Sequence, residues 1–320
     1  MELTKETRIP LAVETRALTK KYKQKTAVNH MNMQVPEGAI YGFIGRNGAG
    51  KSTTLKMLCG LAHPTEGEIS LYGKPSHSPL AARRIGCLIE SAGIYPNLTA
   101  RQNMMVKAKC IGLADEKKVD DLLSLTGLSP AEPKKAKTFS MGMKQRLGIA
   151  LALLGNPDLL ILDEPINGLD PEGVREIRQL ILKLNEEGKT FLISSHILGE
   201  LSKISTHYGI IQNGNLVEQL EREELERNCE DYFFIQVDDP RRALALIQEY
   251  RPDIRAEAED GSTLHLYGLQ EGGSMNRYLI ENRIQVYASG FHHMDLEEYF
   301  LARMDGAGVT EQRKETNSHV

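Results

Sequence analysis

One glycine-rich segment has the composition of a phosphate-binding loop. It reads Gly45-Arg-Asn-Gly-Ala-Gly-Lys51-Ser52, after an apolar run at 39–44 and before a stretch of helical character from Thr53. Glycines let backbone N–H groups point at phosphate oxygens at the positive end of a helix dipole. The Lys51 ammonium would add a point charge, and the Ser52 hydroxyl would bind magnesium. The segment therefore predicts a site for the phosphates of a nucleotide.

Two adjacent acids end an apolar run farther along the chain. The run Leu159-Leu-Ile-Leu is followed by Asp163 and Glu164. Ligands of open α/β sheets bind at the carboxyl ends of strands, so both carboxylates would reach the phosphates. We expect Asp163 to hold magnesium through its water shell and Glu164 to polarise the attacking water. Such acids are common when they occur alone, and it is the phosphate loop that favours catalysis.

Further segments resemble the ordered motifs of ABC proteins. The run Phe139-Ser140-Met-Gly142-Met-Lys-Gln145-Arg146 resembles the ABC signature, and Asn167-Gly-Leu-Asp170 resembles the D-loop. Ser195-His196 resembles the switch histidine, and Tyr22 resembles the aromatic residue that stacks on adenine. The chain is identified on these motifs as a member of the ABC ATPase family over about residues 11–220.

The resemblance implies a shared active site between two copies. Two such domains pack head to tail around two ATP molecules, so Ser140 and Gly142 of one copy would close over the γ-phosphate held by the other. His196 would then bond the γ-phosphate and report its loss. A lone Tyr or His is more often structural, and only the order of the motifs favours these roles.

The expected site residues fall into three groups. Catalysis is assigned to Glu164, His196 and Lys51, and Mg²⁺ to Ser52, Asp163 and Glu90. ATP binding is assigned to Tyr22, Gly45, Arg46, Asn47, Gly48, Ala49, Gly50, Lys51, Ser52, Thr53, Ser140, Gly142 and Asp170.

Glu90 departs from the usual ABC pattern. Most ABC proteins carry glutamine after the third sheet strand, whereas this chain reads Cys87-Leu-Ile-Glu90-Ser91. This acid, the segment at 90–99 and Met141 in place of a signature glycine resemble exporters that protect against bacitracin and lantibiotics. Since hard cations prefer charged oxygen ligands, the carboxylate joins the expected metal set. The resemblance implies export of a drug or peptide antibiotic.

The elements that position these residues are typical of a P-loop α/β domain. Strands are expected in one sheet, and a helical insertion is expected at about 95–155, where no β-rich run occurs. The expected strands are 39–44, 85–89, 159–162, 190–194 and 209–211.

A different pattern of expected helices and strands begins after a charged stretch near 222. The expected order is strand 233–237, helix 241–250, strands 254–259 and 263–269, helix 275–283, strand 285–291 and helix 295–304. This order predicts a small α+β accessory domain of split βαβ type. We therefore expect an ATP-binding domain at 1–224, the accessory domain at 225–305 and a disordered tail at 306–320. For the accessory domain, packing or dimer stabilisation is favoured over ligand sensing.

Composition limits the partners. The 320 residues are 41% hydrophobic and 26% charged with a net charge of −4, which is typical of a folded chain without a basic nucleic-acid surface. The first twenty residues carry scattered charges and do not resemble a signal peptide, and no apolar run reaches about 18 residues. We therefore expect a cytoplasmic protein held at the inner face of the membrane by a separate transmembrane permease.

Two alternatives to a transporter ATPase stay open at this point. A soluble ABC ATPase acting on ribosomes or DNA is disfavoured, because there is one set of motifs and no long coiled coil between them. A nucleotide-binding regulator without turnover is disfavoured because the catalytic residue types are all in place. The sequence does not specify the cargo.

Overall fold

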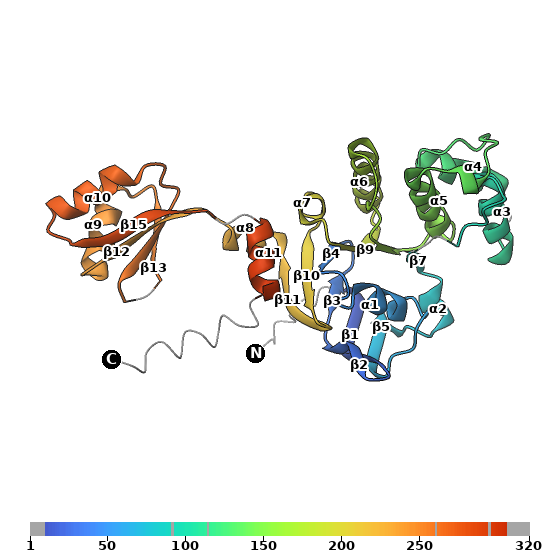
Figure 1. Ribbon diagram of the computed structural model, residues 1–320, viewed down its shortest axis with the longest axis horizontal. Helices are drawn as coiled ribbons and strands as arrows, with labels where there is room; N and C mark the ends of the chain where they lie inside the picture. The colour runs from blue at the N-terminus through green and yellow to red at the C-terminus, as the bar shows by residue number, and fades with distance from the viewer. Residues whose placement is uncertain (1–9, 91–92, 114, 260, 294–295, 306–320) are drawn as a thin grey trace, which may run out of the picture. The chain divides into compact units, whose positions relative to one another are not determined.

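The computed structural model describes residues 10–90, 93–113, 115–259, 261–293 and 296–305 (Figure 1). Contacts within the chain divide it into two compact units. Of the described residues, the first unit contains those up to Arg222 together with 303–305, and the second contains those from Glu223 to Ala302. The expected tail at 306–320 lies outside the described residues.

A mostly parallel sheet forms the centre of the first unit. In the described part of the chain it has six strands in the order β11-β10-β4-β9-β8-β7, of which only the edge strand β11 is antiparallel to its neighbour. The strands are β4 (Ile40–Ile44), β7 (Ile85–Leu88), β8 (Leu159–Asp163), β9 (Thr190–Ser195), β10 (His207–Gln212) and β11 (Asn215–Glu221). Every residue of β4, β8 and β9 is buried, as expected for strands covered on both faces.

An antiparallel sheet lies beside it in the same unit. It contains β1 (Leu11–Tyr22), β2 (Lys25–Met31), β3 (Gln34–Pro36), β5 (Glu66–Leu71) and β6 (Lys74–Pro75). Val13, Leu18 and Val28 from this sheet share a core with Tyr41 and Phe43 of β4. The two sheets therefore enclose α1 (Lys51–Leu58), whose Leu55 and Leu58 belong to the same core. The first unit confirms the predicted P-loop α/β fold.

Helices occupy the segment expected as an insertion. The described part of 95–155 contains no strand, and Figure 1 shows its helices gathered in one green layer. They are α3 (Ala100–Cys110), α4 (Glu116–Leu125) and α5 (Met141–Leu153), with a 3-10 turn at Ala136–Thr138. Met104, Leu123 and Leu147 pack in a separate core there. The remaining helices of this unit are α2 (Pro79–Ala82), α6 (Pro171–Glu186) and α7 (Leu198–Leu201).

The second unit has the predicted split βαβ order. Its sheet runs β13-β14-β12-β15, and its elements are α8 (Arg222–Asn228), β12 (Tyr232–Val237), α9 (Pro240–Tyr250), β13 (Arg255–Ala258), β14 (Thr263–Tyr267), α10 (Gly272–Glu281), β15 (Val286–His292) and α11 (Leu296–Asp305). Alternate residues of β12, namely Phe233, Ile235 and Val237, are buried in a core with Ile247 and Leu279. Helices therefore cover one face of this sheet.

The end of α11 differs from the expected boundary. The sequence placed all of 225–305 in the accessory domain, whereas the contacts return the chain to the first unit at Arg303. Arg303 Nε lies 3.1 Å from Glu218 Oε2, and Gln212 Nε2 donates a hydrogen bond to the Met304 carbonyl. Met304 is also buried. The first unit is thus discontinuous in sequence, and the other crossing lies at Arg222, two residues before the predicted one.

Candidate active site

The predicted phosphate loop joins the buried strand β4 to helix α1. The Lys51 ammonium lies in the turn that precedes the helix, where it donates to the Gly45 carbonyl at 2.5 Å and to the Arg46 carbonyl at 3.4 Å. Its side chain is only 6% exposed. A buried ammonium satisfied by loop carbonyls is held in place to meet an anion at the helix start.

Gly50 has a conformation that other residues rarely adopt. It precedes α1 with φ 115° and ψ −3°, and a Cβ built there would lie 2.5 Å from the Ala27 carbonyl oxygen of β2. Gly48 also has a positive φ, of 81°. These glycines let the loop turn tightly beside the antiparallel sheet. The loop shape therefore depends on glycine at both positions.

The two acids lie at the carboxyl end of β8. Asp163 is 7% exposed, and the Ser194 hydroxyl donates to its Oδ1 at 2.5 Å. Glu164 has a left-handed backbone with φ 50°, and its N–H donates to both the carbonyl and the hydroxyl oxygen of Ser194, each at 3.1 Å. A strained φ held by such bonds often marks a functional site. β9 thereby fixes the direction in which β8 presents its acids.

Glu164 meets two of the other predicted catalytic residues. Its Oε2 lies 2.8 Å from His196 Nδ1, and its Oε1 lies 3.6 Å from Lys51 Nζ. A carboxylate accepts hydrogen bonds only, so His196 Nδ1 carries the hydrogen and the Nε2 side of the ring is left for another ligand. The Glu164 and His196 side chains are 21% and 38% exposed. The structure therefore brings Lys51, Glu164 and His196 together.

A cleft of about 320 Å³ opens over this loop. It is lined by Tyr22, Lys25, Ala27, Arg46, Asn47, Gly48, Gly50, Lys51, Ser52, Thr53 and Glu164. Tyr22 is 48% exposed, and the Lys20 ammonium lies 5.0 Å from the centre of its ring. An exposed ring at one end and a buried ammonium at the other suit a planar base joined to a phosphate chain. Most of the predicted ATP-binding residues thus share one cleft.

Glu90 lies at a different opening. Its carboxylate forms an ion pair with the Lys56 ammonium at 2.6 Å, and its side chain is 63% exposed. Glu90 is not among the residues that line the cleft. The hydrogen bond that Lys56 donates to Glu90 raises the pKa of Lys56, and the negative charges of Glu90 and Asp163 act in the same direction. Lys56 therefore links the Glu90 segment to α1. The assignment of Glu90 to the metal set stays a prediction.

Glu90 lines a groove of about 450 Å³ beside α5, which we call the Glu90 groove. The other lining residues are Gly93, Ile94, Pro96, Ala136, Lys137, Met141, Lys144 and Gln145. The Gln145 amide also donates to the Glu164 carbonyl at 3.4 Å. The groove thus borders the segment that carries the catalytic acid.

The predicted signature and D-loop residues start two helices. Ser140 caps the start of α5 by accepting a hydrogen bond from Met143 N–H at 3.2 Å, and Asp170 caps the start of α6 by accepting one from Gly173 N–H at 3.1 Å. Neither these residues nor Gly142 are among the residues that line the described cleft.

Three residues of the site were not singled out from the sequence. Ser194 orients both acids, Gln145 contacts the Glu164 carbonyl, and Lys56 pairs with Glu90. The signature run contains Gln145 and the expected strand 190–194 ends at Ser194, but neither pattern indicates which residues these side chains contact. Lys56 follows the phosphate loop on α1, and nothing local marks it.

The chain is similar to ATP-binding proteins of known transporters. Residues 28–167 match the ABC transporter family. The chain is 41% identical over 301 residues to the bacitracin transport ATP-binding protein BcrA of Bacillus licheniformis, a match that covers 93% of this chain and 98% of that protein. It is 43% identical over 220 residues to the lantibiotic transport ATP-binding protein SrtF of Streptococcus pyogenes, covering 69% of this chain and 95% of that protein.

A solved structure agrees with the fold of the first unit. A dimeric ATP-binding cassette in a post-hydrolysis state with ADP and phosphate matches with a TM-score of 0.60 and 27% identity, over 66% of this chain and 98% of that one. Among the described helices, none has the length and apolar character required to cross a bilayer. The resemblance read from the motifs is confirmed: the chain is an ATP-binding and ATP-hydrolysing member of the ABC transporter family, of the group that includes the bacitracin and lantibiotic transport proteins.

Proposed function

We propose that this chain energises export of a peptide antibiotic through a separate membrane permease, using Lys51, Asp163, Glu164 and His196 as its catalytic set. The observation that carries the catalytic part is the meeting of Lys51 and His196 at the Glu164 carboxylate. The cargo is inferred from the similarity to BcrA. That match covers 301 residues and 98% of BcrA, so it extends beyond the ATP-binding unit into the accessory unit.

Mg²⁺ fits the donor set beside the cleft. Asp163 offers a buried carboxylate and Ser52 a hydroxyl, and hard cations prefer oxygen ligands of this kind. These two residues would hold the ion, and Glu90 would approach it only after leaving Lys56. When bound, Mg²⁺ supplies positive charge to the β- and γ-phosphate oxygens.

The protein residues then divide the work of hydrolysis. The amides and ammonium of the phosphate loop bind and orient the phosphates. Glu164 lies within reach of the cleft and accepts the proton of the attacking water. His196 orients the Glu164 carboxylate through the hydrogen bond from Nδ1, which leaves Nε2 to bind the γ-phosphate. Tyr22 covers the base, which fixes the other end of the nucleotide.

Ser140, Gly142 and Asp170 support a dimeric site. They begin helices outside the cleft of their own chain, so they would act only across an interface with a second copy. The similar cassette that was solved with ADP and phosphate is a dimer. We propose a dimer here too, paired head to tail as the motifs imply, with the ATP-bound state closed and the hydrolysed state open.

We propose that the permease docks at the Glu90 groove and the adjoining segment Tyr95–Asn103. Tyr95 is 56% exposed, and the Asn103 amide, which is buried, binds the Tyr95 and Thr99 carbonyls and so stiffens the turn. A stiff segment that borders the Gln145 contact to Glu164 can carry motion from the site to the groove. The complex would hold the chain at the inner face of the membrane.

Crosslinking is expected to reach the permease from this segment. A cysteine at Asn97, which is exposed, should crosslink to the permease in membranes that contain both proteins, after the exposed Cys110 is replaced by serine. Gln102 is a second site, although its side chain caps α3 through Thr99 N–H at 2.9 Å, so Asn97 disturbs the fold less. A cysteine at exposed Glu187, where α6 ends, is the matched control. Crosslinks from Asn97 only to a second copy of the chain would contradict the docking.

Glu90 is expected to couple hydrolysis to transport. Glu90→Gln removes the charge that binds Lys56 but keeps the side-chain shape, so transport should fall by about tenfold while ATPase activity changes less than about threefold. Resistance to bacitracin or a lantibiotic and ATP turnover are measured in parallel. Because wild-type chain with its permease must confer resistance in this assay, it also tests the cargo.

A matched control separates coupling from the loss of a surface ion pair. Glu66 pairs with Lys21 at 2.8 Å on an exposed surface, so Glu66→Gln loses the same kind of contact outside the site. It should change neither readout, since exposed pairs contribute at most about 1 kcal/mol. Equal losses of resistance and turnover in Glu90→Gln would make Glu90 catalytic, and no loss in either would remove its role.

A further inference from the structure

The residue assigned as the switch histidine is followed by a helix too short to be stable alone. α7 contains four residues, Leu198–Leu201, and no side chain caps its start. Its hydrogen bonds to Ile197 and Leu198 carbonyls measure 3.3 and 2.9 Å. A single turn pays the cost of helix nucleation without propagation, so tertiary contacts must hold it. The position of His196 depends on those contacts, because only Ile197 separates it from α7.

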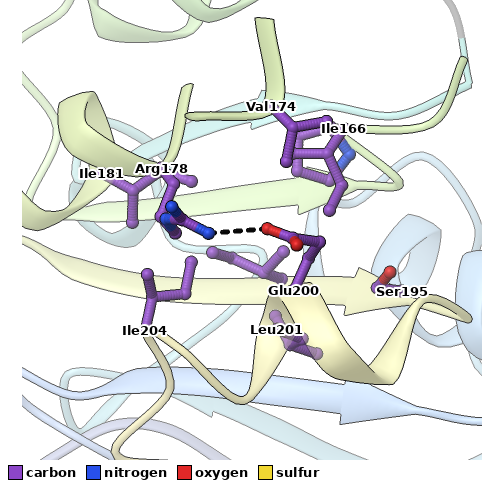
Figure 2. Close-up of a pocket in the computed structure, with 10 residues that line it drawn as sticks. Ile166, Val174, Arg178, Ile181, Ser195, Glu200, Leu201 and Ile204 are labelled. Carbon is purple, nitrogen blue, oxygen red and sulfur yellow. Dashed lines mark hydrogen bonds and ion pairs between the residues drawn. The ribbon is translucent and has the colours of Figure 1, made fainter. Parts of the chain in front are cut away.

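One ion pair ties this turn to the helix that follows the D-loop. Arg178 of α6 donates through Nη1 to Glu200 Oε2 at 2.7 Å, as Figure 2 shows. The two side chains are 25% and 26% exposed, so the pair is partly shielded from water. Lys203 also contacts Glu200 Oε1, at 2.5 Å, but Lys203 is 53% exposed and lies in the same short segment. Arg178 is therefore the ionic contact that joins α7 to another element.

Apolar side chains surround the ion pair. Leu201 and Ile204 line one small cavity with Val174 and Ile181 of α6, and Figure 2 shows them around the Arg178–Glu200 contact. The space left among them is about 10 Å³, close to the smallest that holds a single water. Close packing of this kind transmits displacement instead of absorbing it. A shift of α6 would move α7 when the ion pair is intact.

We propose that Arg178 and Glu200 are positioning residues for ATP hydrolysis, which hold the His196 segment in register with the helix that begins at Asp170. When the D-loop at 167–170 moves at the dimer interface, α6 moves with it. The ion pair passes this movement to α7 and so keeps His196 in contact with Glu164. Neither Arg178 nor Glu200 is among the residues that line the described cleft. The inference rests on the proposed role of His196 and goes beyond it, because it names what places that histidine.

The test compares kinetic constants in four variants of the full chain. Glu200→Gln and Arg178→Met should lower kcat about 5- to 20-fold, since small misplacements of a catalytic group have effects of this order. The KM for ATP should stay within about twofold, because the phosphate loop is untouched. Arg178→Lys retains a cation and should recover most of kcat. Lys203→Ala removes the other cation from Glu200 and should leave kcat near wild type.

Two readouts separate positioning from a merely structural role. The thermal midpoint of unfolding and the KM for ATP are measured together with kcat for each variant. If Arg178→Met folds poorly, the isosteric variant Glu200→Gln still tests the ion pair. A kcat within twofold of wild type in both variants would overturn the inference. So would a fall in kcat matched by a lower midpoint and a raised KM. His196→Ala is measured in the same series: if it is fully active, the role of His196 fails, whereas if it alone is slow, only the positioning inference fails.

Discussion

Glu164→Gln should bind ATP and turn it over at least about a hundredfold more slowly than the wild type, the scale typical of losing an acid-base group. The amide keeps the length of the side chain but cannot accept the proton of the attacking water. It also removes a negative charge 3.6 Å from Lys51 and beside the expected γ-phosphate. The variant should therefore accumulate as an ATP-bound dimer, which size-exclusion chromatography detects while phosphate release measures turnover.

Glu186→Gln is the matched control for this experiment. Glu186 is exposed at the end of α6, so the same exchange there alters charge without touching the cleft. Its turnover should equal that of the wild type. Wild-type turnover in Glu164→Gln itself would remove Glu164 as the base and leave the Lys51–Glu164–His196 cluster as a binding arrangement only.

Gly50→Ala should weaken ATP binding at least about a hundredfold, which corresponds to about 2.7 kcal/mol. A Cβ at this position would lie 2.5 Å from the Ala27 carbonyl oxygen, and a φ of 115° is unfavourable for alanine. Because the obstacle is backbone, no side-chain rotation relieves it, and the loop must move away from the phosphates. Binding of a fluorescent ATP analogue and the thermal midpoint are both expected to fall.

Gly60→Ala isolates the strain of a positive φ from the clash. Gly60 has φ 71°, and a Cβ there would meet no atom within 4 Å. It lies after α1, outside the cleft lining, so the change should cost about 1 kcal/mol of stability and leave ATP affinity unchanged. Wild-type affinity in Gly50→Ala would show that the loop tolerates the displacement, and an equal loss in both variants would show that the clash with Ala27 is not the cause.

The phosphate loop and the strands β4 and β8 were predictable because their sequence signals are local. A glycine-rich turn between an apolar run and a helix indicates its own backbone geometry, and β4 and β8 lie within one residue of the predicted ranges. The acids at 163 and 164 follow from the end of such a strand. The family motifs added their order along the chain.

Contacts between distant segments were not predictable from one sequence. Lys56 and Glu90 are 34 positions apart, and Arg178 and Glu200 are 22 apart, and each is an ordinary charged residue in its local setting. Helical periodicity places such residues on a face but does not select a partner. The return of α11 to the first unit was not predictable for the same reason, since no local pattern pairs Arg303 with Glu218.

This return makes the ATPase region impossible to excise with a single cut. A chain that ends after Arg222 would keep the residues of the cleft. It would lose the Arg303–Glu218 ion pair, the hydrogen bond from Gln212 to the Met304 carbonyl and the buried Met304 side chain. A truncated ATPase therefore needs residues from both sides of the accessory unit, namely those up to Arg222 and those from Arg303. A transfer of the accessory unit to another ATPase has to keep both of these connections.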